Sequence, residues 1–253
     1  MSEQVLVEAR EGVLEVTINR PEARNAMTKE AAEAIAAAME SLDAEDDLRC
    51  AILTGAGGTF CAGMDLKGFL RGEMPVAGDR GFGGITDWTP KKPIIAAVDG
   101  YALAGGFELA LACDMIVAAR DAKFGIPEAK RGLVAAGGGV VQLPRLLPRP
   151  LAMELALTGD PITAQRAYEF GLVNRLTDGP AIDGARELAR TVADNGPLAL
   201  VASKGIIRNS WNWENDQITA NQTPYIGHVF VSEDAKEGAR AFAEKRKPEW
   251  KGR

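Results

Sequence analysis

The fold is decided by an apolar run that leads into a glycine-rich turn and a second apolar segment, Ile94-Ile95-Ala96-Ala97-Val98-Asp99-Gly100-Tyr101-Ala102-Leu103-Ala104-Gly105-Gly106-Phe107-Glu108. Residues 93–99 have the length and composition of a buried strand, and residues 104–112 predict a helix. Small residues in the turn let a ligand approach the backbone, and a helix N-terminus leaves N–H donors without partners. These donors favour negative charge, so the stretch predicts an α/β unit that can hold an anion.

A second stretch, further upstream, has the same design. The apolar run Ala51-Ile52-Leu53 leads through a glycine loop into Phe60-Cys61-Ala62-Gly63-Met64-Asp65. A single glycine-rich stretch more often serves close helix–sheet packing or a tight turn. Two of them together can present two N–H donors to one oxyanion, and each donor of such a hole contributes roughly 3 to 4 kcal/mol of transition-state stabilisation.

Two glutamates accompany these turns. Glu108 lies three residues after Gly105, in the first turn of the expected helix, and Glu128 follows Ile126-Pro127 at a strand end 20 residues later. An isolated Glu is usually a solvated surface residue, but Glu108 falls within an apolar stretch where an unpaired carboxylate is costly. We expect both carboxyls to face one pocket and to perform acid–base chemistry.

The rest of the chain divides into a sheet-containing part and a helical part. A hairpin is expected over residues 5–8 and 13–19, a helix capped by Thr28 over 29–44, and strands over 49–54 and 115–118. Beyond Leu151 the pattern is mostly helical, over residues 151–157, 163–170, 181–193, 198–209 and 233–245. A change in composition near residue 190 predicts a core of residues 1–190 and a helical region of residues 191–253.

Composition excludes several classes of function. The net charge is −6, with 29 Lys and Arg against 35 Asp and Glu, so a nucleic-acid partner is not expected. The three cysteines have no paired spacing, and no apolar run is long enough for a membrane span, so a cytoplasmic protein is expected. The single histidine, His228, excludes a His-rich metal site and is interpreted as structural.

Three segments occur in an order and spacing typical of one family. They are Phe60-Cys61-Ala62-Gly63-Met64-Asp65-Leu66-Lys67, Ala102-Leu103-Ala104-Gly105-Gly106-Phe107-Glu108-Leu109-Ala110-Leu111-Ala112-Cys113-Asp114 and Phe124-Gly125-Ile126-Pro127-Glu128. Together they resemble the signatures of the enoyl-CoA hydratase/isomerase, or crotonase, family, and the resemblance covers nearly the whole chain. It implies an α/β fold, a spiral of repeated ββα units followed by a C-terminal helical trimerisation region.

The resemblance also implies an activity and a set of residues for it. The activity is that of an enoyl-CoA hydratase, a hydro-lyase that adds water reversibly and syn to a 2-enoyl-CoA. The N–H groups of Met64 and Gly105 would form the oxyanion hole around the thioester carbonyl. The glutamates would hold a water between them: Glu108 helps to deprotonate it for attack on C3, and Glu128 delivers a proton to C2. No metal or redox cofactor is implied, since coenzyme A enters as part of the substrate.

Coenzyme A binding and assembly follow from the same resemblance. The residues assigned to the coenzyme A moiety are Ala23, Arg24, Ala62, Asp65, Leu66, Lys67 and, from a neighbouring subunit, Lys245. For Arg24, Lys67 and Lys245 a solvated surface charge is the common alternative. The implied assembly is a homotrimer or a homohexamer made of two trimers. A mobile loop over residues 71–92 is expected to line the acyl pocket; its aromatic residues Phe82 and Trp88 either face that pocket or serve in packing.

Several alternatives stay open. A relative with the same fold can act as an isomerase, or as a dehydratase of a substituted acyl-CoA such as carnitinyl-CoA, and a non-catalytic acyl-CoA binder would keep the glycine loops. The stretch Gly137-Gly138-Gly139-Val140-Val141-Gln142-Leu143 departs from the usual hydratase turn, which leaves the acyl group open. A dinucleotide-dependent dehydrogenase is disfavoured, because Phe60 stands where the fingerprint that begins at Gly55 requires its third glycine.

Overall fold

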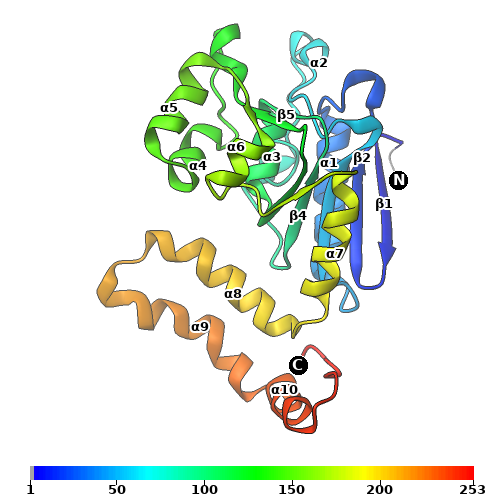
Figure 1. Cartoon of the computed structure of the whole chain (residues 1–253), viewed down its shortest axis with the longest axis vertical. Helices are drawn as coiled ribbons and strands as arrows, with labels where there is room; N and C mark the ends of the chain where they lie inside the picture. Colours follow the sequence, from blue (N-terminus) through cyan, green and yellow to red (C-terminus); the bar gives the residue numbers. More distant parts are fainter. Residues whose placement is uncertain (1–2) are drawn as a thin grey trace.

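A computed structural model describes residues 3–253, and a six-stranded sheet lies at its centre (Figure 1). The strand order is β1-β2-β3-β4-β6-β9; β1 and β2 are antiparallel, and all other neighbours are parallel. The strands are β1 (Val5–Arg10), β2 (Val13–Ile18), β3 (Cys50–Gly55), β4 (Ile94–Val98), β6 (Met115–Ala119) and β9 (Arg175–Thr177). The predicted hairpin and buried strands are therefore confirmed.

Helices cover both faces of this sheet, which explains why its central strands are apolar throughout. Successive side chains of a strand point to opposite faces. On β3, Ala51 and Leu53 join the core cluster that contains α1 (Lys29–Ala44) and α3 (Gly105–Ala112). Cys50 and Ile52 join a second cluster, which contains residues of α7 (Ala181–Ala193).

The first helix has the bounds that the sequence predicts. The Thr28 side chain accepts a 3.1 Å hydrogen bond from the N–H of Ala31, which satisfies one of the free donors at the N-terminus of α1. The buried residues of α1 recur at helical spacing, and they include Ile35, Met39 and Leu42. A cap and an amphipathic period together therefore suffice to place this helix.

A smaller sheet and several short helices lie at the end of the molecule that carries α2 (Figure 1). The small sheet has the order β5-β7-β8. The elements at this end are α2 (Leu66–Leu70), β5 (Tyr101–Leu103), β7 (Lys123–Gly125), α4 (Gly139–Leu146), α5 (Arg149–Thr158), β8 (Ile162–Thr163) and α6 (Ala164–Glu169). The two predicted glycine turns meet here, because Cys61 pairs with Ala102 of β5, the strand that leads into α3.

The C-terminal helices stand apart from the sheet, at the opposite end from α2 (Figure 1). They are α8 (Pro197–Asn209), α9 (Ile218–Val231) and α10 (Glu233–Glu244). The division near residue 190 falls in the last turn of α7, which itself packs on the sheet. The helix α9 was not predicted, because the segment is rich in residues with low helix propensity. Within residues 3–253, none of the helices combines the length and the apolar character that crossing a bilayer requires.

The segment 71–92 is irregular, as expected, but its middle is packed rather than free. It contains a single 3₁₀ turn, Gly78–Arg80, among loops. Ile85 is fully buried in the core, and Gly84 has a φ of 78° and lies directly against α1. This packing fixes the position of the neighbouring residue Phe82.

Candidate active site

The two predicted glycine turns pack directly against each other. Cys61 exchanges backbone hydrogen bonds with both ends of β5: its N–H donates to the carbonyl of Tyr101, and its carbonyl accepts from Leu103, each at 3.0 Å. A Cβ added to Gly106 would lie 2.1 Å from the carbonyl oxygen of Cys61. A Cβ on Gly63 would lie 2.7 Å from the Cβ of Ala104 and 3.3 Å from the backbone N of Gly105. Glycine is therefore required at both positions so that the two backbones can approach.

This contact brings together the two N–H groups predicted for the oxyanion hole. Gly105 is the first residue of α3, where the N–H has no acceptor within the helix. Met27 pairs with the backbone on either side of Met64, through the carbonyl of Gly63 and the N–H of Asp65, so the N–H of Met64 points the other way. Within residues 3–253, neither Met64 nor Gly105 donates a backbone hydrogen bond.

Backbone strain occurs at this point of the chain. Ala104, between β5 and α3, has φ 53° and ψ −131°, which is unusual for a residue with a side chain. Such a conformation costs on the order of 1–3 kcal/mol, and it persists only where the surrounding structure enforces it. Here it turns the chain sharply enough to expose the first N–H of α3 beside Gly63.

Glu108 lies in the first turn of α3 and is almost completely buried, with 5% of its surface exposed. The N–H of Gly139, at the start of α4, donates a 2.9 Å hydrogen bond to its Oε1. Burial raises the pKa of Glu108 to about 7, and the charges of Glu128 and Asp87 act in the same direction, whereas the N–H groups of Gly139 and Gly137 oppose them. The carboxyl can therefore exchange a proton near neutral pH.

Glu128 lies in the 3₁₀ helix Pro127–Arg131 that follows β7. Its Oε2 is buried and has no hydrogen-bond partner among residues 3–253. Burial raises the pKa of this carboxyl as well. Because the charge of Glu128 acts on the pKa of Glu108, the two predicted carboxyls lie near each other. A buried carboxylate oxygen without a protein partner is available to a water or a substrate.

The way in which Glu108 is held was not predicted from the sequence. A Cβ on Gly137 would lie 2.8 Å from Oε2 of Glu108, and a Cβ on Gly139 would lie 3.1 Å from Oε1. The two glycines therefore leave the space that the carboxyl occupies. The signal was present in the sequence, since a glycine run that opens a helix exposes N–H donors that attract a carboxylate.

The residues predicted to bind coenzyme A near α2 lie close together. The carbonyl of Arg24 accepts a 3.0 Å hydrogen bond from the N–H of Ala62, which places Ala23 and Arg24 beside the 60–67 segment. Leu66 and Lys67 are exposed at the start of α2.

Asp65 is engaged within the protein. Its Oδ1 accepts hydrogen bonds from the N–H groups of Lys67 and Gly68 and so caps α2. Its Oδ2 forms a 3.0 Å ion pair with Arg20, which sequence analysis did not single out. Burial opposes the ionised form, but the hydrogen bonds from Gly68, Arg20 and Lys67 hold the pKa of Asp65 below its usual value. This carboxylate thus fixes the position of α2.

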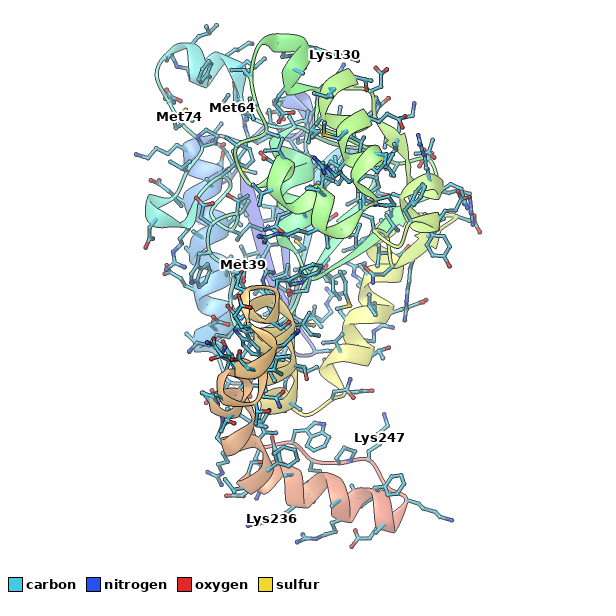
Figure 2. The ribbon with its side chains drawn as sticks, turned by 90° about the vertical axis from the view of Figure 1, so that its left-hand side faces the viewer. Met39, Met64, Met74, Lys130, Lys236 and Lys247 are labelled. Atoms are coloured by element: carbon cyan, nitrogen blue, oxygen red, sulfur yellow. The ribbon has the colours of Figure 1, made fainter. Side chains whose placement is uncertain are left out.

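Lys245 does not join these residues within one chain. It is exposed at the C-terminal end of α10, at the opposite end of the molecule from α2 (Figure 1). Figure 2 shows the same separation, with Met64, Met74 and Lys130 at one end and Lys236 and Lys247 at the other. Any contact of Lys245 with this site must therefore come from another copy of the chain.

The described residues offer no evident metal centre. Among residues 3–253, no group of three or more His, Cys, Asp and Glu side chains is arranged to hold a metal ion. Cys50, Cys61 and Cys113 are buried free thiols, and burial raises the pKa of each.

Comparison with known proteins shows the family to which the chain belongs. The model of the family described as enoyl-CoA hydratase/isomerase matches residues 8–253. The chain belongs to the enoyl-CoA hydratase/isomerase family. A crystal structure of an enoyl-CoA hydratase from Mycobacterium tuberculosis H37Rv is 56% identical, with a TM-score of 0.97 and full coverage of both chains. The predicted crotonase-like fold is thereby confirmed.

Other members of the family have more specific names. A carnitinyl-CoA dehydratase of Salmonella arizonae is 44% identical over 261 residues, which cover the whole of both chains. A crystal structure of a carnitinyl-CoA hydratase from Mycobacterium avium is 42% identical, with a TM-score of 0.79 and full coverage of both chains. The relatives of this family member thus include both hydratases and dehydratases of CoA thioesters.

Proposed function

We propose that the protein adds and removes water across C2 and C3 of an acyl-CoA thioester. The observation that carries this proposal is the pairing of buried Glu108 with Glu128, whose Oε2 is buried, beside two N–H groups without acceptors. Such a constellation supplies a base, an acid and oxyanion stabilisation, which are the functions that this reaction needs.

In the hydration direction, the thioester carbonyl accepts hydrogen bonds from the N–H groups of Met64 and Gly105. Glu108 takes a proton from water as its oxygen bonds to C3, and the C2=C3 electron pair moves to form an enolate. The N–H groups stabilise the negative charge on the enolate oxygen. Glu128 then gives a proton to C2, which restores the carbonyl. Dehydration follows the same steps in reverse.

We further propose that coenzyme A lies along the surface formed by Ala23, Arg24, Ala62, Asp65, Leu66 and Lys67. The exposure of Arg24 and Lys67 supports this placement, because both are free to reach phosphate groups. Lys245 of a second copy would complete the site. The proposed chemistry uses no metal or redox cofactor.

Two candidate substrates follow from the relatives. The first is a carnitinyl thioester, because a carnitinyl-CoA dehydratase is 44% identical over the full length of both chains. The second is an unsubstituted 2-enoyl-CoA, because the 56% identical structure is that of an enoyl-CoA hydratase. Both reactions use the same two carboxyls and differ only in the substituent beyond C3.

The test is to incubate the purified protein with crotonyl-CoA and, separately, with its γ-trimethylammonium analogue. Loss of absorbance of the conjugated thioester reports hydration of each. Turnover of at least one substrate is expected, and the ratio of the two kcat/KM values ranks the candidates. A protein that binds both thioesters and hydrates neither would overturn the proposal and favour a binding role.

A further inference from the structure

The aromatic ring of Phe82 lies against the oxyanion turn. A Cβ on Gly105 would lie 2.3 Å from Cζ of Phe82, 2.5 Å from Cε1 and 2.8 Å from Cε2, so the tip of the ring contacts the Gly105 backbone. The base of the same side chain reaches toward Glu108: a Cβ on Gly137 would lie 3.3 Å from Cβ of Phe82 and 2.8 Å from Oε2 of Glu108. Phe82 thus spans the distance between the carbonyl position and the catalytic carboxyl.

The backbone on both sides of Phe82 is held in place. A Cβ on Gly83 would lie 2.4 Å from Cδ2 of Leu109 in α3, and a Cβ on Gly84 would lie 2.4 Å from the carbonyl oxygen of Ala32 in α1. The N–H of Gly83 also donates a 2.9 Å hydrogen bond to the carbonyl of Pro75. Displacing the ring by moving the backbone would therefore require the loop to leave two helices at once.

An acyl chain placed by the proposed mechanism must pass this ring. Its carbonyl lies at Gly105, and its C2 and C3 lie beside Glu108, so the carbons beyond C3 extend from a region that Phe82 already borders. A well-packed apolar wall accepts a group of matching size and rejects a longer one, because the longer group must displace packed atoms.

We propose that Phe82 closes the acyl pocket and restricts the enzyme to short acyl groups of the size of crotonyl. This inference rests on the proposed function, because the mechanism fixes where the acyl chain begins. Phe82 thus acts as a specificity-determining residue. The limit fits an unsubstituted crotonyl thioester, whereas the trimethylammonium group of a carnitinyl thioester extends beyond C4, so the inference favours the unsubstituted candidate.

The experiment compares crotonyl-CoA with 2-octenoyl-CoA in the wild type, Phe82→Leu and Phe82→Ala. The wild type should prefer crotonyl-CoA, and Phe82→Ala should shift the ratio of the kcat/KM values toward octenoyl-CoA by at least about tenfold, the scale of a few methylene groups in an apolar pocket. Phe82→Leu should shift it less. The ratio is internal to each variant, so a general loss of folded protein cancels. A matched control is Phe170→Ala, which removes an exposed ring at the end of α6 and should leave the ratio unchanged.

Binding measurements distinguish a failure of this inference from a failure of the proposed function. The affinities for butyryl-CoA and octanoyl-CoA, measured by calorimetry, should favour butyryl-CoA in the wild type and become similar in Phe82→Ala. Absence of turnover with this binding pattern would overturn the proposed function and support the pocket. Equal preference for both chain lengths in the wild type, or a ratio that Phe82→Ala leaves unchanged, would overturn the role of Phe82.

Discussion

The backbone N–H of Gly139 donates a 2.9 Å hydrogen bond to Oε1 of Glu108, so the first residue of α4 holds a carboxyl that projects from α3. The contact joins two helices whose relative position sets the direction of the carboxyl. Gly137 borders the other oxygen, Oε2. Small changes in this glycine run should therefore act on catalysis through the position of Glu108.

The variant Gly137→Ala tests this directly. Its Cβ would lie 2.8 Å from Oε2 of Glu108, and the end of that flexible side chain can move aside without disturbing the fold. We expect kcat to fall about 100-fold, the effect of misplacing a catalytic group by about 1 Å, with little change in melting temperature. The control is Gly179→Ala, where a Cβ meets no atom within 4 Å. Unchanged kcat in Gly137→Ala would show that the position of Glu108 does not limit the reaction.

The variants Glu108→Gln and Glu128→Gln should each lose hydration while they still bind acyl-CoA. Each removes one proton-transfer step, which contributes roughly 10²–10⁴-fold to the rate, and keeps the size of the side chain. Steady-state kinetics and calorimetric binding of butyryl-CoA separate the two effects. Glu169→Gln, at an exposed position on α6, is the control. Substantial hydration by Glu128→Gln would contradict the mechanism in which water addition uses both carboxyls.

The raised pKa of Glu108 predicts a dependence of stability on pH. This carboxyl ionises near its ordinary value of 4.5 in the unfolded chain and at about 7 in the folded protein. Between these values the folded protein binds more protons, so the contribution of Glu108 to the free energy of unfolding falls as pH rises through this window. Glu108→Gln lacks this loss and keeps the acceptor for Gly139.

Urea unfolding at about pH 5 and about pH 8 measures this effect. From about pH 5 to about pH 8 the free energy of unfolding should change in favour of Glu108→Gln relative to the wild type, by about 3 kcal/mol at most. Glu169→Gln should show no such gain. A difference between Glu108→Gln and the wild type that stays constant with pH would mean that burial does not disfavour the charged form of Glu108.

Local patterns in the sequence were enough to place much of the fold and the two carboxyls of the candidate site. The cap at Thr28 and the helical period set α1, and the order of strand, turn and helix placed Glu108 at the start of α3. These features depend on residues that are close in the sequence. Glu128 could be placed at a strand end for the same reason.

Contacts between distant segments could not be predicted in this way. The Gly139–Glu108 hydrogen bond joins residues 31 positions apart, and the approach of Phe82 to Gly105 depends on how its loop packs on α1 and α3. Neither leaves a periodic signal in the sequence. The helix α9 was missed because Thr219, Thr223, Pro224 and Gly227 oppose helix formation locally, so its stability must come from contacts outside the segment.

A buried ion pair attaches the C-terminal helices to the core. The ammonium group of Lys204, on α8, lies 2.7 Å from Oδ2 of Asp114 and donates to the carbonyl of Lys92, and Arg208 reaches Oδ1 of Asp114 at 3.1 Å. Asp114→Ala would leave the buried ammonium group of Lys204 without a carboxylate partner, which lowers the free energy of unfolding by about 3–5 kcal/mol. We expect lower stability in urea and faster hydrogen exchange in α8. Glu33→Gln, in an exposed pair with Lys29, should change stability by less than about 1 kcal/mol. Equal effects of the two variants would contradict this role of Asp114.

The exposed apolar surface of the C-terminal helices predicts that the protein self-associates. None of the residues of α9 is buried within the chain, and large apolar side chains are exposed on this part of the molecule, with Trp211 at 64%, Phe230 at 75% and Phe242 at 87%. Such exposed apolar surface is usually covered by a partner. We expect sedimentation to give the mass of three or six chains of 26.9 kDa each. Phe230→Asp should lower this mass. It should also weaken coenzyme A binding, because Lys245 can reach the site only from another copy. The control is Leu6→Asp, at an exposed position on β1, which should do neither. A monomeric wild type with full affinity for coenzyme A would contradict both the assembly and the role of Lys245.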